Sequence, residues 1–214
     1  METCSLKDLG LEKCCARAAA VLRSGGVVIY PTDTLYALGA DALSDEAVQK
    51  IYDIKGREEL KPIHAIVADA QMAERYGELH DEAHLILKNV PTGTLTLIVR
   101  KKELNAGITR GIDTFGFRIP DNDFCKMLAT VFDGPITATS ANKSGHKPER
   151  KVGRILAQLG KEAALVDVVI DAGELPLRQP STVVDMTKDR PLIIREGAIA
   201  ASDFWNAIRE EQSE

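Results

Sequence analysis

Residues 27–39, VVIYPTDTLYALG, form the stretch that decides the predicted fold. The apolar run at residues 27–30 is typical of a short buried strand, and Pro31 ends it. The loop that follows brings together Thr32, Asp33 and Thr34, two hydroxyls and a carboxylate that could bind a polar ligand. Loops that follow strands are the usual ligand sites of α/β sheets. The alternative, which these residues alone favour, is a turn in which the side chains bond their own backbone.

The chain on both sides of this stretch alternates helical and strand-like patterns. Apolar residues at helical spacing, together with capping residues such as Ser44, predict helices at residues 11–22, 44–56, 69–75, 81–88, 123–132, 149–159 and 202–210. Apolar runs predict strands at residues 27–30, 62–67, 95–99, 114–119, 135–139, 165–171, 181–186 and 192–195. Because some consecutive strands have no helix between them, we expect an α/β sandwich with one twisted mixed sheet and helices packed on it.

Length and composition fit a single globular domain. The 214 residues are 44% hydrophobic and 28% charged, which excludes collagen-like, disordered and disulfide-stapled classes. We expect an N-terminal helix in residues 1–24, packed on a main domain at residues 25–200, and a C-terminal helix in residues 201–214. No apolar run approaches the ~20 residues of a membrane span, and no apolar leader opens the chain. These features predict a cytoplasmic protein without a membrane anchor.

The charge balance argues against a general nucleic-acid binder. The chain carries 27 Lys and Arg against 32 Asp and Glu, a net charge of -5, whereas such binders are usually basic. Residues 143–154 are the exception, with five Lys or Arg against Glu149 alone. This segment is either a footprint for a polyanion or a solvated helix face.

The four cysteines and four histidines show no metal-binding pattern. Cys4, Cys14, Cys15 and Cys125 include no C-x-x-C pair, so we expect reduced thiols and no zinc ribbon. His80 and His84 have helical spacing but no third ligand nearby. A P-loop, a G-x-G-x-x-G motif and a G-x-S-x-G elbow are also absent from the sequence. A nucleotide site would therefore be a cationic cleft lined by hydroxyls.

Further polar residues gather at strand and helix ends. Lys55 and Arg57 follow a predicted helix; they either cap its dipole, worth ~0.3–1 kcal/mol, or bind phosphate. Residues 137–147, TATSANKSGHK, leave a strand with small hydroxyl and amide side chains that suit an anion. Arg118 lies in an apolar strand, so it either pairs with an acid or binds a ligand carboxylate.

Taken together, these segments resemble the YrdC-like family of threonylcarbamoyl-adenylate synthases. The match runs from about residue 25 to residue 199 and depends on the order of seven pieces, of which Lys-x-Arg and Ser-x-Asn are the most specific. The pieces are PTDTLYALGADA (31–42), IKGR (54–57), GTLTLI (93–98), FRIP (117–120), SANKSG (140–145), STVVD (181–185) and REGAI (195–199).

The resemblance implies the family's α/β sandwich with a large open cleft, in its short single-domain form. It also implies a nucleotidyltransferase reaction in which L-threonine, bicarbonate and ATP give threonylcarbamoyl-AMP and diphosphate. The product would feed the N6-threonylcarbamoyl modification of adenosine 37 of tRNA (t6A37), through a downstream threonylcarbamoyl transferase complex. Mg²⁺ would arrive with ATP, and no dedicated protein metal site is expected.

The resemblance also assigns residues to the two ends of the site. Threonine would lie against Thr34, Ile66, Arg118, Ala138 and Ser181, with Arg118 suited to a bidentate carboxylate contact. Residues for ATP would be Lys55, Arg57, Lys61, Thr114, Ser140, Asn142 and Arg195. Four of these, Lys55, Arg57, Ser140 and Asn142, would act on the reacting groups. Pro148 replaces a serine that relatives often carry, and proline cannot donate the same contact.

Three other functions compete with synthesis of the adenylate. Members of the family have also been regarded as double-stranded-RNA-binding proteins, and the basic segment at 143–154 would support that function. Related carbamoyl-transfer domains occur within larger chains that this sequence has no room to contain. A paralogue without activity would lack Lys-x-Arg or Ser-x-Asn, and both are present here.

Overall fold

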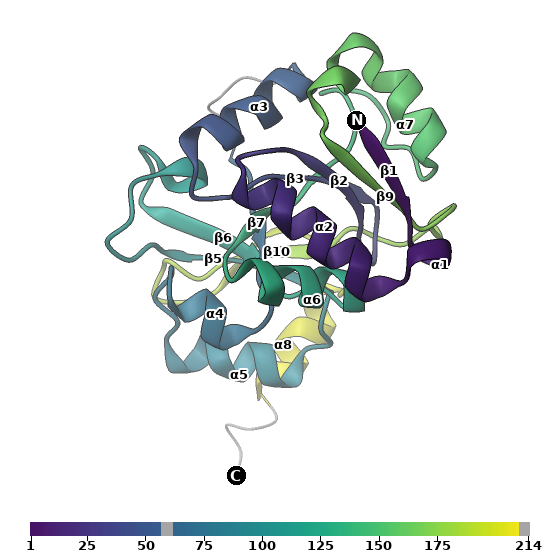
Figure 1. Ribbon diagram of the computed structural model, residues 1–214. Coiled ribbons are helices and arrows are strands. Elements are labelled where there is room, and N and C mark those ends of the chain that lie inside the picture. The colour runs from purple at the N-terminus through teal and green to yellow at the C-terminus, as the bar shows by residue number, and fades with distance from the viewer. Residues whose placement is uncertain (57–61, 210–214) are drawn as a thin grey trace.

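The computed structural model describes residues 1–56 and 62–209, in which helices alternate with strands (Figure 1). The helices are α1 (Leu6–Leu9), α2 (Leu11–Arg23), α3 (Asp45–Lys55), α4 (Ala70–Glu74), α5 (Asp81–Asn89), α6 (Asp123–Phe132), α7 (Val152–Leu159) and α8 (Ala201–Arg209), with 3-10 turns η1 (Gly107–Thr109) and η2 (Gly160–Leu165). The strands are β1 (Glu2–Ser5), β2 (Val28–Pro31), β3 (Tyr36–Gly39), β4 (Ala65–Ile66), β5 (Leu95–Arg100), β6 (Thr114–Arg118), β7 (Ile136–Thr137), β8 (Thr139–Ser140), β9 (Val168–Asp171), β10 (Thr182–Asp185) and β11 (Leu192–Arg195).

The strands form two mixed sheets. One has the order β1-β9-β2-β3-β8 and the other has the order β11-β10-β5-β6-β4-β7. Both contain parallel and antiparallel pairs, so the predicted mixed α/β fold is confirmed. The number of sheets differs from the prediction, which placed all strands in one.

Ala138 is the residue at which the chain passes from one sheet to the other. Before it, β7 pairs with β4; after it, β8 pairs with β3. The Ala138 N–H donates to the His64 carbonyl at 2.9 Å and so stays on the β4 side. A change of sheet at one residue leaves no gap in an apolar run, which is why the sequence predicted a continuous strand at 135–139.

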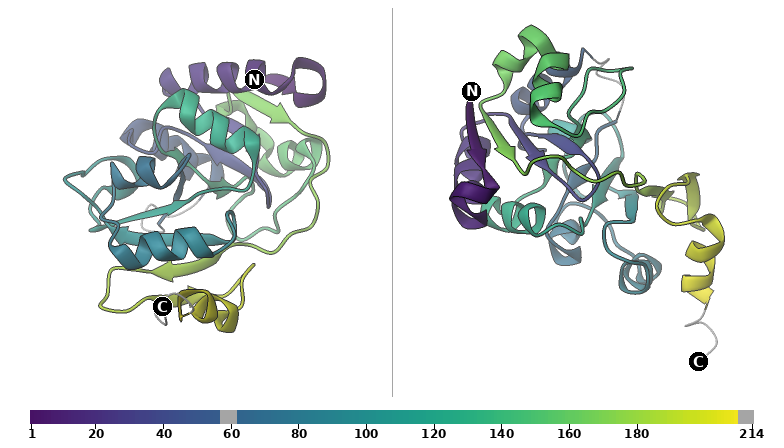
Figure 2. Two further views of the ribbon diagram at one scale, coloured as in Figure 1. Left: turned by 90° about the horizontal axis from the view of Figure 1, so that it is seen from below. Right: turned by 90° about the vertical axis from the view of Figure 1, so that its right-hand side faces the viewer.

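Helices cover the sheets, and their apolar faces fill the core. Helix α2 packs beside α6, as the views in Figure 2 also show, and buries Cys14, Cys15, Ala18 and Leu22. The Cys15 Sγ lies 3.6 Å from the Phe124 carbonyl oxygen on α6. At the other end of the molecule α8 packs beside α5, where the Asn89 side chain donates to the Ala207 carbonyl.

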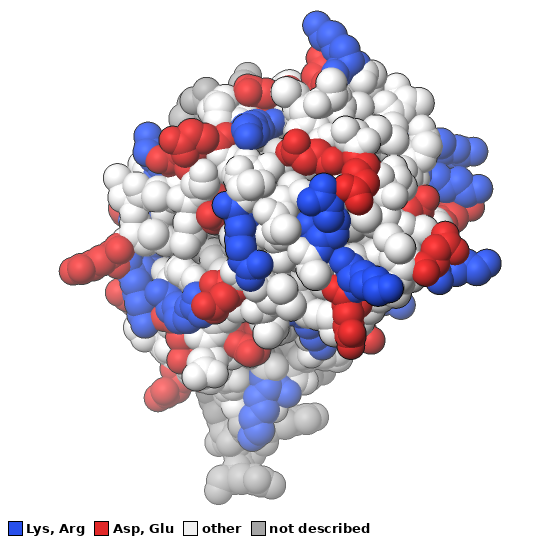
Figure 3. Space-filling model, viewed as in Figure 1, with Lys and Arg blue, Asp and Glu red and all other residues white. Residues whose placement is uncertain are grey.

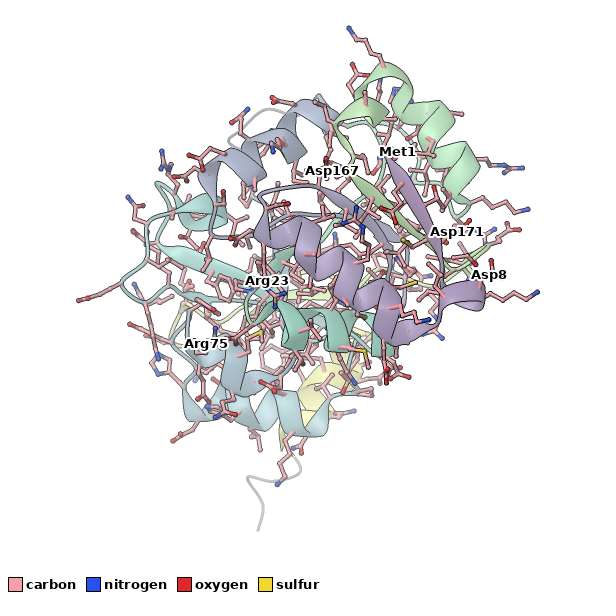
Figure 4. All side chains as sticks on the ribbon, in the orientation of Figure 1. Met1, Asp8, Arg23, Arg75, Asp167 and Asp171 are labelled. Atoms are coloured by element: carbon pink, nitrogen blue, oxygen red, sulfur yellow. The ribbon has the colours of Figure 1, made fainter. Side chains whose placement is uncertain are left out.

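Two strands were not predicted. The polar sequence of β1, ETCS, gives no apolar run, and this strand is held by parallel pairing with β9. Strand β3 follows β2 after a four-residue turn, so residues 36–39 were interpreted as part of the loop. Asp167, labelled in Figure 4, accepts a hydrogen bond from the Val27 N–H at 2.8 Å, which ties the segment before β9 to the start of β2.

All four cysteines are free and buried. Burial raises the pKa of the Cys15 thiol to about 12, and it raises the pKa of Cys125 well above its usual value. These thiols act as apolar packing groups, because a buried thiol that stays protonated is a poor nucleophile. Among the described helices, none combines the length and apolar character that a membrane crossing needs.

Candidate functional site

Lys55 joins two motifs that lie far apart in the sequence. It is the last residue of α3, which the predicted N-cap Ser44 precedes. The C-cap that follows is Gly56 in the left-handed conformation, φ 54° and ψ 43°. The Lys55 side chain turns inward and is only 4% exposed. Its ammonium donates to the Ser140 carbonyl at 2.5 Å, the Asn142 carbonyl at 2.9 Å and the Asn142 Oδ1 at 3.3 Å. The Lys-x-Arg and Ser-x-Asn segments therefore meet in space.

Asn142 holds the loop that follows β8 in one conformation. Its Nδ2 donates to the carbonyls of Lys143 and His146, and its Oδ1 accepts from the Ser140 hydroxyl at 2.5 Å. The Ser144 N–H donates to the Lys55 carbonyl at 2.8 Å. The sequence left open that Lys55 was only a solvated cap; that alternative is wrong, because the side chain is buried inside this network.

Arg118, at the end of β6, pairs with an acid. Its Nη2 donates to Asp33 Oδ2 at 2.5 Å and to the Gly93 carbonyl at 2.7 Å, and its Nη1 donates to the Thr34 hydroxyl at 3.2 Å. The two charged side chains are 8% and 5% exposed, so the ion pair is buried. Of the two alternatives for this arginine, the structure shows the acid partner.

The hydrogen bonds that Arg118 already makes leave no room in this structure for the predicted bidentate contact with a ligand carboxylate. Each two-pronged edge of a guanidinium uses Nη2, together with either Nη1 or Nε. Because both Nη2 hydrogens already have acceptors in Asp33 and Gly93, neither edge is free for a ligand carboxylate in this structure. A carboxylate would meet Arg118 through the remaining Nη1 hydrogen.

The loop between β2 and β3 divides its polar residues between structure and site. The Thr32 hydroxyl accepts from the N–H groups of Thr34 and Leu35 and donates to the Leu35 carbonyl at 2.7 Å. This is the backbone-bonded turn that the sequence favoured, and Thr32 forms it. The Thr34 hydroxyl instead faces Arg118, and it lies 3.1 Å from the Thr32 hydroxyl.

Gly93 makes room for the ion pair, and replacing it gives a test. A Cβ there would lie 2.5 Å from Asp33 Oδ2, and Gly93 has φ +84°. We expect Gly93→Ala to lower the free energy of unfolding by roughly 2 kcal/mol or more, because left-handed strain of ~1–3 kcal/mol adds to the clash. Gly111→Ala is the matched control, since Gly111 has φ +71° and open space around it. The added Cβ would also lie 2.8 Å from the Asp121 backbone nitrogen. Equal losses for the two variants in urea unfolding would show that the clash with Asp33 and Asp121 adds nothing to the left-handed strain.

Ser181 and Arg195 lie together at the start of β10 and the end of β11. The Ser181 hydroxyl is 2.8 Å from that of Thr96, and the Arg195 guanidinium donates to the Ser181 carbonyl at 2.8 Å. Thr96 precedes Leu97, which pairs with Phe117 next to Arg118. Strand β5 therefore lies between Ser181 and the Arg118 end of β6.

Three more residues of the predicted site, Ile66, Ala138 and Thr114, are placed by strands β4, β6 and β7. Ile66 is 1% exposed and pairs with Arg118 on one side and Ile136 on the other, two residues before Ala138. Thr114 lies at the opposite end of β6, about 13 Å from Arg118 at ~3.3 Å per residue. Arg57 and Lys61 lie outside the described residues. The strand pairings thus connect Arg118 through Ile66 to Ile136, and Ala138 follows two residues later, before the Ser140 segment that Lys55 contacts.

The charges of the basic segment are largely compensated by acids, of which Glu149 lies within the segment and Glu162 and Glu174 lie outside it. Lys143 pairs with Glu162, Arg154 lies near Glu149, and Arg150 and Lys151 share Glu174. A small hollow of about 190 Å³ lies in this segment. It is lined by Lys147, Pro148, Glu149, Arg150, Lys151, Arg154 and Glu174. On the face drawn in Figure 3, cations and acids are likewise intermixed. The solvated helix face predicted as one alternative therefore fits this segment better than a concentrated cationic footprint.

Several known proteins are similar to this chain. A sequence profile of the Sua5/YciO/YrdC family, described as "Telomere recombination", matches residues 20–197. A protein of Methanocaldococcus jannaschii is 39% identical over 176 residues, 82% of each chain. The threonylcarbamoyl-AMP synthase of Bacillus subtilis is 35% identical over 90% of this chain and 56% of its own length.

A solved structure has both the fold and a bound amino acid. The crystal structure of Pyrococcus abyssi Sua5 complexed with L-threonine matches with a TM-score of 0.84 and 32% identity, over 92% of this chain and 58% of that one. This chain thus spans little more than half the length of the Bacillus and Pyrococcus relatives. Because the family profile covers most of the sequence and the fold agrees, the chain belongs to the Sua5/YciO/YrdC family.

Proposed function

We propose that this chain is an L-threonylcarbamoyladenylate synthase, a nucleotidyltransferase that converts L-threonine, bicarbonate and ATP into threonylcarbamoyl-AMP and diphosphate. The observation that carries the proposal is the contact of Lys55 with Ser140 and Asn142, which unites the two most specific motifs. Relatives named threonylcarbamoyl-AMP synthase support it.

We assign two ends to one site. The amino-acid end comprises Thr34, Arg118 and Ser181, with Ile66 and Ala138 beside them. The nucleotide end comprises Lys55, Ser140 and Asn142, with Thr114 and Arg195 toward its edges and Arg57 and Lys61 assigned from the sequence. Mg²⁺ would enter as the ATP complex, held by phosphate oxygens.

The chemistry needs two bonds to form in turn. The threonine ammonium group first loses a proton, and the resulting amine nitrogen attacks the carbon of bicarbonate. The bond from that carbon to the hydroxyl oxygen then breaks, and this hydroxyl leaves as water with a second proton from the nitrogen. A carbamate oxygen then attacks the α-phosphorus, and the bond to the oxygen that bridges to the β-phosphate breaks, which releases diphosphate. Both partners of the second step are anions, so positive charge at Lys55 and Arg57 would lower its barrier. Binding would hold the two anions in line, which supplies much of the remaining acceleration.

In this structure the polar groups of the Lys55 cluster bond to one another. All three ammonium hydrogens of Lys55 have acceptors in Ser140 and Asn142. We infer that ATP binding exchanges one or more of these bonds for phosphate contacts, while the charge of Lys55 acts on the phosphates throughout.

Diphosphate release tests the proposal. Purified protein is incubated with threonine, bicarbonate and Mg-ATP, and each substrate is omitted in turn. The proposal predicts release only when all three are present and no RNA is needed. Release that proceeds without threonine, or that requires RNA, would contradict it. The product would pass to a downstream threonylcarbamoyl transferase complex acting on tRNA in the cytoplasm.

Neutralising the basic segment separates synthesis from RNA binding. We expect Lys147, Lys151 and Arg154, changed together to Gln, to leave diphosphate release and the melting temperature nearly unchanged, because exposed ion pairs contribute only ~0–1 kcal/mol each. Any RNA binding should weaken and lose salt dependence. Loss of diphosphate release would instead place this segment in the synthase site, and unchanged RNA affinity with an unchanged salt slope would leave it as a solvated helix face.

A further inference from the structure

The Asp33–Arg118 pair is more than an anchor for one side chain. It is buried, and Asp33 engages Arg118 through Oδ2 alone. Asp33 Oδ1 and Arg118 Nε are both buried without a hydrogen-bond partner among the described residues. Leaving such atoms unpaired costs free energy, so a pair that is kept in this state invites a functional explanation.

Asp33 cancels the charge of the residue that faces the amino-acid end. With Asp33 on Nη2, Arg118 retains one hydrogen at Nη1, beside the Thr34 hydroxyl, and the buried N–H of Nε, both in a locally neutral setting. An amino acid at neutral pH is a zwitterion with no net charge. ATP, diphosphate and bicarbonate are anions. A neutral pair can donate to the carboxylate of a zwitterion without attracting those anions through an uncompensated charge.

We propose that Asp33 is a specificity-determining residue: by neutralising Arg118 and occupying its Nη2, it keeps the amino-acid end selective for a zwitterion and closed to phosphate anions. This inference builds on the proposed function, because it takes Thr34 and Arg118 as the threonine pocket. It adds a residue that touches no reacting atom. Lys55 would instead supply the positive charge for the phosphates, because its contacts with the neutral oxygens of Ser140 and Asn142 do not cancel that charge.

Competition between inorganic phosphate and threonine is the test. Threonine binding is measured by calorimetry with increasing phosphate at constant ionic strength, in the wild-type protein and in Asp33→Asn. The variant keeps an oxygen acceptor for Nη2 and removes the negative charge. Phosphate should not compete with threonine in the wild type. In Asp33→Asn it should compete, with affinity raised at least about tenfold, because a close buried charge is no longer cancelled.

Two further variants separate charge from position. Asp33→Asn combined with Arg118→Gln removes both charges, and direct titration with inorganic phosphate, without threonine, should show the raised phosphate affinity of Asp33→Asn lost again. Asp121→Asn is the control: Asp121 also borders Gly93 but is exposed and makes no ion pair with Arg118, so phosphate should behave as in the wild type. Melting curves establish that each variant is folded before titration.

The outcomes distinguish this inference from the proposed function. Phosphate that competes with threonine in the wild type would overturn the role of Asp33, and this needs no variant. Equal phosphate affinity in Asp33→Asn and Asp121→Asn would overturn it as well. A wild-type protein that binds no threonine would instead contradict the proposed function.

Discussion

Lys55→Ala is expected to lower diphosphate release at least about a hundredfold, since loss of a cation beside the reacting phosphates costs ~2–4 kcal/mol of transition-state stabilisation. The same variant should also lose stability. The buried ammonium makes three hydrogen bonds, and bonds from a charged group contribute about 1.5–3 kcal/mol each before any compensation. From the sequence alone Lys55 had the small structural value of a helix-end cation, and its burial overturns that expectation.

A paired design separates the two losses at Lys55. Lys55→Met keeps most of the side-chain volume and is measured for both activity and the free energy of unfolding. Lys50→Met is the matched control, because Lys50 lies on the same helix and donates to the Gly25 carbonyl at 2.8 Å, away from the loop after β8. Lys50→Met should keep nearly full activity. Activity within twofold of wild type in a folded Lys55→Met would remove Lys55 from the reaction.

Arg118→Ala should abolish threonine-dependent diphosphate release while ATP binding stays measurable. It should also destabilise the fold by about 3–5 kcal/mol, because Asp33 would be left buried without its partner. Arg118→Lys keeps the charge but not the planar donor, so a partial recovery of stability with little recovery of turnover is expected. Arg100→Ala, on the neighbouring strand β5 and exposed, is the control.

The choice of amino acid tests the same pocket. We expect threonine to be the best substrate, serine a weak one and valine inert. One methyl group distinguishes threonine from serine, and an apolar wall such as Ile66 discriminates it by only ~1–3 kcal/mol. Valine would leave a hydroxyl-binding group such as Thr34 or Ser181 unpaired, which costs more. Equal turnover of valine and threonine, or loss of ATP binding but not threonine binding in Arg118→Ala, would reverse the two ends of the site.

Apolar patterns predicted the elements that bury a clear face. Helix α6 and strand β11 have the predicted bounds, and Ser44 caps α3 as predicted. Such elements can be predicted because the spacing of their apolar residues is visible within a short stretch of sequence. The sheet to which a strand belongs is decided by long-range pairing, and the switch at Ala138 involves one residue only. No local pattern marks it.

The site shows the same division. The sequence motifs identified Lys55, Asn142 and Arg118 as candidate site residues, because polar residues that follow or interrupt apolar segments are visible in a sequence. Their partners were not visible: the sequence offered Asp33 only as a carboxylate that could bind a polar ligand, not as the partner of Arg118. The partner of the Ser181 hydroxyl is Thr96, 85 positions earlier. The signal that could have joined them was the coincidence of an arginine that needs an acid with a carboxylate next to the predicted ligand residue Thr34.

The most direct measurement follows the carbon atom of bicarbonate. The protein is incubated with L-threonine, Mg-ATP and carbon-13 bicarbonate, and the products are separated and weighed by mass spectrometry. The proposed function predicts one adenylate that contains AMP, threonine and the labelled carbon, formed in equal amount to diphosphate. ATP consumption that yields only AMP or threonyl-AMP, without the labelled carbon, would contradict it.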